Sequence, residues 1–434
     1  MKNNKSKDYI HLLTPWIKDS QQYLHTFPDR PELMCYGAGY NSWGVQTNQK
    51  ALSAFAVAAL DPDSDFESYG LARHEVLEQA KAMLRFSLQS HIEGDYSCAD
   101  GEKWGHTWIS ALGVERMMHG VDILIPHLTT EDLALLRKVL VSEADWLLEN
   151  YIIGAGLLAE SGKNKPESNI WNGAILSRVA TMYPDTPNAK AYKEKATHFF
   201  INGISIESDE TNETVYDGIM VKDALRGANF FDSFALDHHG YMNLGYMIIC
   251  LSNIAMLHFF YKKHNEKPPE ALYHNAKGLW TLARSMTYED GRLNRIGGDT
   301  RIRYSYCQDY ALPAWLLAED MFDEDCSMLE SGWLDILSTE TVYNGDGSFL
   351  SARCAGLKKK SPLYYTRLES DRGNALSMMA LWHRQFDLSG KNPAVNKNSW
   401  YSSYHGAYMQ KGEKRMASFV WRSAEPSQGQ CAPI

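Results

Sequence analysis

The sequence predicts a mainly α fold, a ring of helical hairpins of the (α/α)-toroid kind followed by a short β segment. Long segments repeat apolar residues at helical spacing up to about residue 387, and connections rich in Gly, Asp and Asn join them. After residue 388 the pattern changes to alternation. We therefore expect a helical domain over residues 1–387 and a β-rich segment over 388–434, which would open a β-sandwich domain.

Roughly eleven or twelve helices are expected before the β segment. The stretch "TTEDL" (129–133) is typical of a helix start, because a threonine hydroxyl can cap the first turn. No repeat of fixed length is visible, which disfavours a regular solenoid. A plain helical bundle or an irregular α-solenoid would give the same periodicity, so both stay open beside the toroid. The clearest helical segments are residues 48–61, 74–91, 129–152, 188–204, 241–263, 269–287 and 373–386.

The β segment contains a recognisable hairpin. Residues 401–410, "YSSYHGAYMQ", and 415–424, "RMASFVWRSA", alternate in character and flank the turn "KGEK" (411–414). Such alternation is typical of half-buried strands.

The composition excludes several classes of function. The 434 residues carry a net charge of −10, which disfavours nucleic acid as a partner because phosphate binding needs clustered Lys and Arg. The N-terminus has no apolar signal region, and no run reaches the roughly 20 apolar residues of a membrane span. The seven cysteines form no CxxC pair and fit reduced thiols. These features predict a cytoplasmic protein with no membrane partner.

One segment, "GANFFDSFALDHHGYMNLGYM" (227–247), combines histidines, tyrosines and acidic residues. We expect a helix to begin near Asp237 or His238, where the free N–H groups of a first turn would keep a histidine neutral. On such a helix His239 and Tyr246 share a face, and His238 lies close to Tyr246. A capped helix with hydrogen-bonded histidines is the structural alternative. A metal site is disfavoured because no HExxH-like pattern or suitably spaced ligand set exists.

Two further segments offer groups that bind a carboxylate. In "ESNIWN" (167–172), Asn169 and Asn172 lie three apart at a helix start beside Trp171, and amides donate hydrogen bonds without adding charge. Capping of the helix by Asn169 is the structural alternative. Residues 289–310, "EDGRLNRIGGDTRIRYSYCQDY", place four arginines around a Gly-Gly turn beside Tyr304 and Tyr306, and guanidinium groups bind carboxylates and sulfates bidentately. A solvated basic loop is the alternative there. The four arginines are Arg292, Arg295, Arg301 and Arg303.

Aromatic residues are abundant, with 12 Trp and 24 Tyr. Their faces stack on sugar rings, but they also fill helical cores. The loops "GYNSWG" (39–44) and "KWGHTW" (103–108) gather Gly and Trp and are the strongest candidates for ligand contact.

With these segments together, the chain resembles the (α/α)-toroid polysaccharide lyases, both the hyaluronate, chondroitin and xanthan lyase group and the heparinase II/III-like group. "NIWN" (169–172) looks like the Asn-bearing helix start of the first group. "DSFALDHHGYMNLGY" (232–246) looks like its later His and Tyr segment, with the tyrosine one residue short when counted from His238. The second group carries "NHG", which is similar to "HHG" (238–240) and would make His239 the family histidine.

The resemblance spans most of residues 30–320 and implies β-elimination at a uronic acid, without metal or organic cofactor. Asn169 or Asn172, with an arginine, would neutralise the carboxylate beside C5. A histidine or an ionised Tyr246 would remove the C5 proton, and a tyrosine would protonate the leaving O4. The predicted catalytic residues are Asn169, His238, His239, Tyr241 and Tyr246, and the predicted substrate-binding residues are Asn172, Trp171, Trp104, His106, Trp108, Trp43, Arg295, Arg301 and Arg303. The expected partner is an acidic polysaccharide or oligosaccharide.

Two alternatives stay open. A glycoside hydrolase on the same toroid, acting for example on unsaturated uronides, needs two carboxylates about 5 to 10 Å apart. A carbohydrate-binding helical protein without catalysis would keep its histidines and tyrosines buried and hydrogen-bonded. The candidate carboxylates of the hydrolase are Asp217, Asp232, Asp237 and Asp299.

Overall fold

The structure, a computed structural model, describes residues 5–154, 156, 165–238, 240–296, 307–393, 399–422 and 427–433. The chain divides into two compact units made of interleaved segments. The first unit comprises residues 1–151, 175–192 and 336–387, and the second comprises residues 152–174, 193–335 and 388–434. One segment boundary falls between residues 387 and 388, and residues 388–434 belong to the same unit as residues 193–335.

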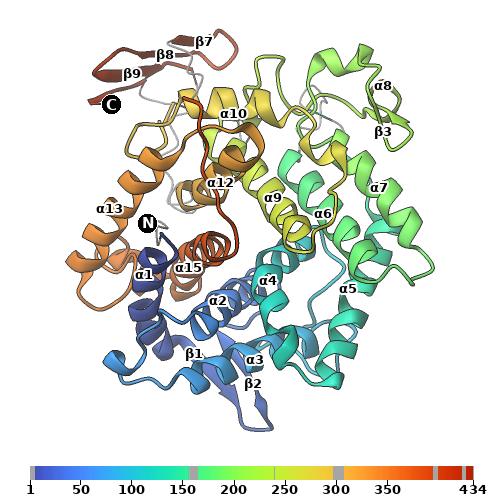
Figure 1. Cartoon of the computed structure of the whole chain (residues 1–434), viewed down its shortest axis with the longest axis vertical. Helices are drawn as coiled ribbons and strands as arrows, with labels where there is room; N and C mark the ends of the chain where they lie inside the picture. The colour runs from blue at the N-terminus through green and yellow to red at the C-terminus, as the bar shows by residue number, and fades with distance from the viewer. Residues whose placement is uncertain are drawn as a thin grey trace. The chain divides into compact units, whose positions relative to one another are not determined.

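The chain is mainly helical, as the sequence predicts, and Figure 1 shows the order of its helices. Three helices, α6, α7 and α13, contribute residues to both units. The helices are α1 (Lys5–Ser20), α2 (Trp43–Leu60), α3 (Arg73–Gln89), α4 (Ser110–Leu124), α5 (Thr130–Asn150), α6 (Pro166–Met182), α7 (Ala189–Ile201), α8 (Val221–Ala224), α9 (Leu244–Lys263), α10 (Ala276–Ser285), α12 (Ala311–Phe322), α13 (Ser327–Asn344), α14 (Ala355–Lys360) and α15 (Pro362–Gln385). Short 3-10 turns cover Gln21–Tyr23, Glu67–Tyr69, Ile125–His127, Glu207–Thr211 and Glu270–Tyr273.

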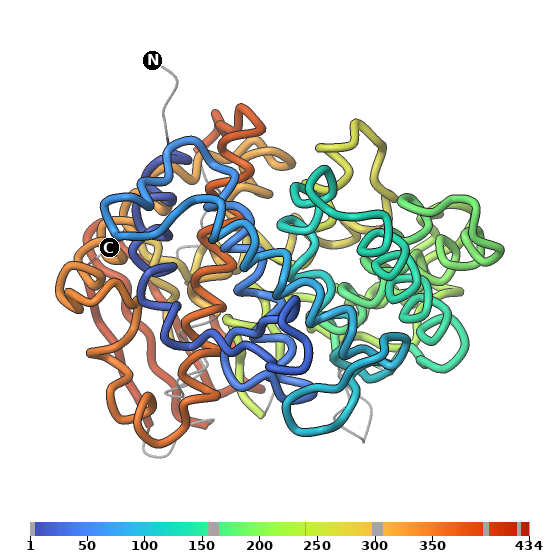
Figure 2. Tube along the Cα trace, turned by 90° about the horizontal axis from the view of Figure 1, so that it is seen from below, coloured from blue at the N-terminus to red at the C-terminus, as the bar shows by residue number. Residues whose placement is uncertain are grey.

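Helix α2 is the centre of the first unit. It is buried along nearly its whole length and packs against α3, α4 and α15, because its apolar residues cover every side of the helix. Its buried Asn48 accepts a hydrogen bond from the Tyr36 N–H at 2.9 Å and donates to the Met83 carbonyl and the Ser87 hydroxyl, both at 3.0 Å. Helices α1 and α15, from the two ends of the sequence, lie side by side in this unit (Figures 1 and 2).

The predicted cap of the helix at "TTEDL" is confirmed. The Thr129 hydroxyl accepts the Asp132 N–H at 3.1 Å, and the Asp132 carboxylate accepts the Thr129 N–H at 3.2 Å. This reciprocal pair satisfies two backbone donors that the first turn of α5 would otherwise leave unpaired.

Helix α9 has the same central position in the second unit, where it packs against α10 and α12. It is long and apolar enough to cross a membrane by length and composition, but 94% of its apolar window is buried inside the protein. Such burial is typical of the core helix of a large helical unit.

The strands form four small antiparallel sheets. The predicted "KGEK" hairpin is confirmed as the β8–β9 pair, in which Lys411 lies opposite Met416. Six of the seven cysteines are buried, and Cys431 is exposed. The strands are β1 (Leu24–Phe27), β2 (Arg30–Tyr36), β3 (Val215–Tyr216), β4 (Ile219–Met220), β5 (Asp237–His238), β6 (Tyr241–Met242), β7 (Ser399–Ser402), β8 (Ala407–Lys411), β9 (Arg415–Val420) and β10 (Gln428–Pro433).

Candidate functional site

The segment with the two histidines forms a hairpin rather than a helix start. Asp237 and His238 pair with Met242 and Tyr241, and Gly240 turns the chain at φ 86°, a conformation that disfavours a side chain. The prediction that a helix begins near Asp237 or His238 is therefore wrong, since α9 begins at Leu244.

The start of α9 is fixed by its cap. The Asn243 side chain accepts the Tyr246 N–H at 3.1 Å and donates to the His238 carbonyl at 3.2 Å. One amide thus positions both the histidine strand and the first turn of α9. The strong preference of Asn for this capping position explains why the helix begins at this point.

His238 and Tyr246 nevertheless meet, as predicted. Their ring centroids lie 4.3 Å apart with planes inclined by 39°. The Nε2 atom of His238 also lies 3.8 Å from Oε1 of Glu167, in the first turn of α6. A histidine, a tyrosine and a carboxyl group therefore converge from three segments of the second unit.

The first turns of α6 present several buried polar groups on one side of the helix. Glu167, Trp171 and Asn172 fall within an arc of roughly 140°, since each residue turns an α-helix by about 100°. Among the described residues, Oε2 of Glu167, the indole N–H of Trp171 and both amide atoms of Asn172 have no hydrogen-bond partner. Buried polar groups are nearly always paired, so a concentration of unpaired ones is typical of a site that binds a ligand.

The two predicted amides differ in their surroundings. Asn169 donates a hydrogen bond to the Asn202 carbonyl at 2.7 Å, which ties α6 to the end of α7. Asn172 is completely buried, and its amide keeps its full capacity to donate and accept within the described part of the chain. Asn172 is therefore better placed than Asn169 to bind a carboxylate.

Burial raises the pKa of the Glu167 carboxyl to about 7. Near neutral pH this group can hold or release a proton, whereas an ordinary glutamate is ionised. Asn253 of α9 donates to the Glu167 carbonyl at 3.3 Å, which fixes the first turn of α6 against α9.

A loop of the C-terminal sheet contacts the same hairpin. Tyr404 packs on Phe231 with ring centroids 4.9 Å apart, and a hydrogen bond to Asp237 raises the pKa of the Tyr404 hydroxyl. Burial lowers the pKa of His405 to about 4, so this histidine is neutral at physiological pH. The strand that carries His238 is thus supported by residues more than 160 positions later in the sequence.

Several predicted residues lie elsewhere. His239, Arg301 and Arg303 fall outside the described residues, as does Asp299. Tyr241 lies in β6, opposite His238, and Arg295 is exposed in the second unit.

The predicted aromatic residues of the first unit divide into two kinds. Trp104 is buried, and its indole N–H donates to the Ser87 carbonyl at 2.7 Å, so it belongs to the core. Trp108 is 45% exposed and meets Trp43 edge-on at a centroid distance of 6.4 Å. The Arg367 guanidinium lies 3.6 Å from the Trp43 ring centroid. Trp108 therefore keeps an exposed surface on which a sugar ring could stack, whereas Arg367 covers one face of Trp43.

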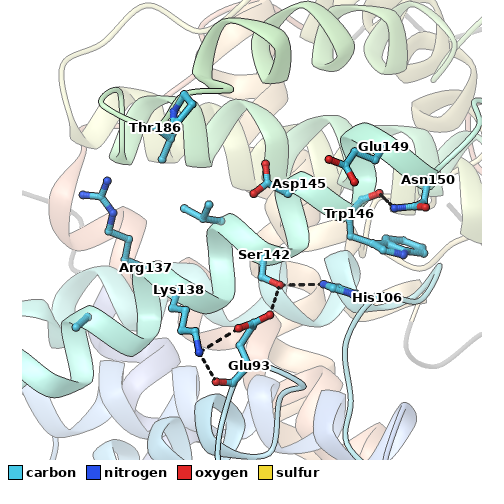
Figure 3. A pocket seen from close by; sticks show the side chains of 13 residues that line it. Glu93, His106, Arg137, Lys138, Ser142, Asp145, Trp146, Glu149, Asn150 and Thr186 are labelled. Carbon is cyan, nitrogen blue, oxygen red and sulfur yellow. Dashed lines mark hydrogen bonds and ion pairs between the residues drawn. The ribbon is translucent and has the colours of Figure 1, made fainter.

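His106 lines a pocket of about 750 Å³ in the first unit, along the side of α5 (Figure 3). Its ring stacks on Trp146 at 5.8 Å, and its Nε2 bonds to the Ser142 hydroxyl at 2.9 Å. Ser142 donates in turn to Glu93, which pairs with Lys138 at 3.0 Å (Figure 3). Arg137, another lining residue, pairs with Asp185 at 2.6 Å, and Asp145 accepts a hydrogen bond from Asn188 at 2.7 Å, so much of the polar lining of the pocket already has partners.

Among the described residues, one cluster has side chains that could bind a metal ion. It contains His91, His106 and Glu143, and one ligand atom from each lies within 4.8 Å of the others. However, Nδ1 of His91 accepts the Glu93 N–H at 3.1 Å, which leaves its single proton on Nε2. That Nε2–H donates to Glu143 at 2.9 Å. A metal ion at Nε2 would displace this proton to Nδ1 and break the hydrogen bond from the Glu93 N–H, so the hydrogen bonds around His91 disfavour a metal.

The described carboxylates of the alternative hydrolase each have different neighbours. Asp232 accepts the backbone N–H of Ser208 at 2.8 Å and its hydroxyl at 3.0 Å. Asp237 interacts with Tyr404, and Asp217 occupies the turn between β3 and β4 at φ 49°.

Sequence reasoning missed Glu167 and Asn253. Glu167 lies one helical turn before Trp171, so the spacing of "ESNIWN" contained a signal for it. Asn253 gives no such signal, because its contact with Glu167 joins residues 86 positions apart.

No protein-family model, curated protein or solved structure matches this chain.

Proposed function

We propose that the protein is a polysaccharide lyase that cleaves a uronic-acid-containing glycan by β-elimination without a metal ion. The observation that carries the proposal is the contact between His238 and Tyr246, with a buried carboxyl of Glu167 3.8 Å from His238 and, on the same helix as Glu167, an Asn172 amide without partners among the described residues. The proposal includes the (α/α)-toroid arrangement of the helices and an acidic polysaccharide or oligosaccharide as substrate.

The first requirement of the reaction is neutralisation of the substrate carboxylate. The C5 proton of a uronic acid is weakly acidic, and hydrogen bonds to the carboxylate stabilise the negative charge that develops when it leaves. In the proposal the Asn172 amide donates to this carboxylate, helped by a protonated Glu167. Burial raises the pKa of Glu167 to about 7, which makes the protonated form accessible near neutral pH. An arginine of the segment 292–303 would add a charged donor.

The second requirement is a base and an acid on adjacent sugar carbons. In the proposal the neutral His238 imidazole takes the C5 proton, and the electrons of the C5–H bond form the C4–C5 double bond. The C4–O4 bond breaks, and the Tyr246 hydroxyl gives its proton to O4. Because the two rings are in contact, the imidazolium can then return a proton to the tyrosine, which restores both groups. His239 and Tyr241 are the alternative base and acid in this assignment.

The direct test uses the chemistry of the product. The protein is incubated with glucuronate-, galacturonate- and sulfated uronate-containing glycans, and near-UV absorbance of a C4–C5 double bond is followed with the number of new reducing ends. Absorbance that rises in step with reducing ends is expected. Reducing ends without absorbance would establish hydrolysis instead, and the absence of both with every glycan would refute the proposal.

A further inference from the structure

The C-terminal sheet has one buried and one exposed face. Its four strands lie in the order β10-β9-β8-β7, and β7, β8 and β9 appear as neighbours in Figure 1. Trp400, Met409, Met416 and Val420 face inward and are buried. The inner face is attached to the second unit, where the Ser418 hydroxyl donates to Oδ1 of the buried Asn294 at 3.1 Å.

Aromatic residues line the opposite, exposed face in one row. The register places Tyr401 opposite Tyr408, and Tyr408 opposite Phe419. Trp421 stacks on both ends of this group, with centroid distances of 6.3 Å to Tyr401 and 6.0 Å to Phe419 and planes inclined by only 26° and 23°. The exposed fractions are 63% for Tyr401, 38% for Tyr408, 48% for Phe419 and 43% for Trp421. We call these four residues the aromatic face.

Polar and basic groups surround the aromatic face. The Tyr408 hydroxyl donates to Gln410 at 2.8 Å, and alternation places Arg415 on the same side of β9 as Phe419. Arg422 follows Trp421 and donates to the Tyr404 carbonyl at 2.6 Å. In the described part of the sheet, the basic residues outside the inner face are Lys414, Arg415 and Arg422, and the acidic residue is Glu413, whereas Lys411 lies on the inner side with Met409 and its Nζ is buried. This local positive charge opposes the net charge of −10 of the whole chain.

The arrangement suits a sugar chain with negative charge. A contiguous exposed aromatic patch marks an interaction surface, because an ordinary surface spreads its apolar side chains singly. Flat rings cover the apolar faces of sugar rings, while hydroxyl, amide and guanidinium groups at the border bind hydroxyls and carboxylates. The excess of basic over acidic residues at the border of this face favours an anionic ligand over a neutral one.

We propose that the aromatic face binds a chain of an anionic polysaccharide at a site separate from the His238 cluster. The identity of the ligand rests on the proposed function, but binding itself does not require catalysis. Tyr404, which packs on Phe231 beside the His238 hairpin, attaches the sheet to the segment that carries the proposed base. The aromatic face and the proposed catalytic residues belong to the same unit, so a polymer bound to the face would stay near the residues proposed to cleave it.

The test compares the full chain with the double variant Tyr401→Ala/Trp421→Ala. Retention is measured in gels that contain a polyglucuronate, a polygalacturonate or a sulfated uronate glycan, and in a gel with a neutral glucan. The matched control is Tyr343→Ala, which removes a tyrosine that is 81% exposed on α13 in the first unit. We expect the double variant to bind the retained anionic glycan at least tenfold more weakly, with the control and the melting temperature unchanged. A further variant, Arg415→Gln, should weaken binding to the anionic glycans.

Each other outcome overturns the inference. Equal retention of wild type and double variant, or no retention of the wild type by any anionic glycan, would exclude a glycan site on this face. A change of the oligomeric state without a change in retention would identify the face as a contact between copies of the chain. Cleavage is measured separately by product absorbance on a short oligosaccharide, so retention without cleavage would refute the lyase proposal alone.

Discussion

A histidine, a tyrosine and a carboxylic acid lie together near each end of helix α9. The two clusters differ in the hydrogen bonds between their side chains. Near the C-terminal end, His258 bonds to the Tyr273 hydroxyl at 2.6 Å and to Asp320 at 2.7 Å. Near the N-terminal end, His238 stacks on Tyr246, and its Nε2 lies 3.8 Å from Glu167, beyond hydrogen-bond distance.

The difference teaches that pairing, rather than residue type, separates a structural cluster from a candidate active site. Burial alone would raise the pKa of Asp320, but hydrogen bonds from His258 and Lys262 hold it below its usual value. Glu167 has no comparable partners among the described residues, and burial raises its pKa to about 7. The hydrogen bonds of the first cluster join helices, whereas in the second cluster Oε2 of Glu167 has no hydrogen-bond partner among the described residues.

The largest expected effect concerns the N-terminal cluster. Tyr246→Phe and His238→Gln should each lower turnover at least about 100-fold, because each removes a group that transfers a proton. Initial rates are measured by product absorbance on the glycan that gives the strongest signal.

The control for these variants is His239→Ala, measured in parallel to establish which histidine acts. Melting temperatures should stay within a few degrees of wild type, since Phe and Gln retain most of the side-chain volume of Tyr and His. Rates close to wild type in both Tyr246→Phe and His238→Gln would contradict the assignment of the site.

The next effect concerns the C-terminal cluster. Asp320→Ala should lower the free energy of unfolding by about 2 kcal/mol, because it leaves His258 and Lys262 without their carboxylate. Denaturant unfolding measures this loss. Because the Asp320 pKa is lowered by folding, its contribution is present above the ordinary aspartate pKa and is lost as the pH falls below it. Two results would contradict a purely structural role for the His258 cluster. One is an unchanged free energy of unfolding at pH 7, and the other is a loss of turnover in a variant that is still folded.

A third prediction uses the raised pKa of Glu167. Because folding raises this pKa from 4.5 to about 7, the protein loses stability as the pH rises through that window. Glu167→Gln removes the titration and should raise the free energy of unfolding at pH 8 by about 2 kcal/mol, with little change at pH 4. Turnover should persist and lose less activity as the pH rises above 7, because Gln, like a protonated Glu, donates a hydrogen bond to the substrate carboxylate at every pH.

Glu369 is the matched control for that experiment. Burial also raises its pKa to about 7, but it accepts hydrogen bonds from the Trp16 indole and from the Phe349 and Leu350 N–H groups. Glu369→Gln exchanges one acceptor oxygen for a donor and should therefore lower stability at pH 8. If both variants change stability in the same direction, the distinction between paired and unpaired carboxyls fails.

The smallest effect concerns the cap that joins the His238 hairpin to α9. Asn243→Ala should cost about 1 kcal/mol of stability, the usual loss for a helix cap. It should also lower turnover modestly, because the His238 carbonyl loses the amide that positions it. Asn243→Ser retains an acceptor for the Tyr246 N–H, so recovery of stability without recovery of turnover would show that the bond to His238 matters for catalysis.

The sequence predicted the parts of the fold whose apolar pattern is continuous. Residues 48–61 and 241–263 lie in or overlap α2 and α9, which are buried on all sides and therefore carry long apolar runs. The hairpin around "KGEK" was equally visible, because its alternating residues face the core and solvent in turn. Local patterns of this kind are sufficient for element type.

The same reasoning failed where a turn interrupted an apolar segment. The hairpin at residues 237–242 depends on one glycine conformation and on the side chain of Asn243, neither of which changes the hydrophobic pattern. Helical spacing predicted that His238 and Tyr246 lie close together. They do lie close together, but the cause is the β5–β6 hairpin, which brings His238 back to the first turn of α9. Glu167 and Asn253 meet across distant segments, and a single sequence contains no trace of that contact.

The exposed position of Cys431 has a practical consequence. It lies in β10 opposite Ala417, one strand away from the aromatic face, whereas burial raises the pKa of Cys35 to about 12 and of Cys98 to about 11. A thiol reagent near neutral pH should therefore modify this strand in preference to the buried thiols, because the thiolate is the reactive form. Without any substitution, the natural sequence thus supplies an attachment point for a fluorophore beside the surface proposed to hold the polymer.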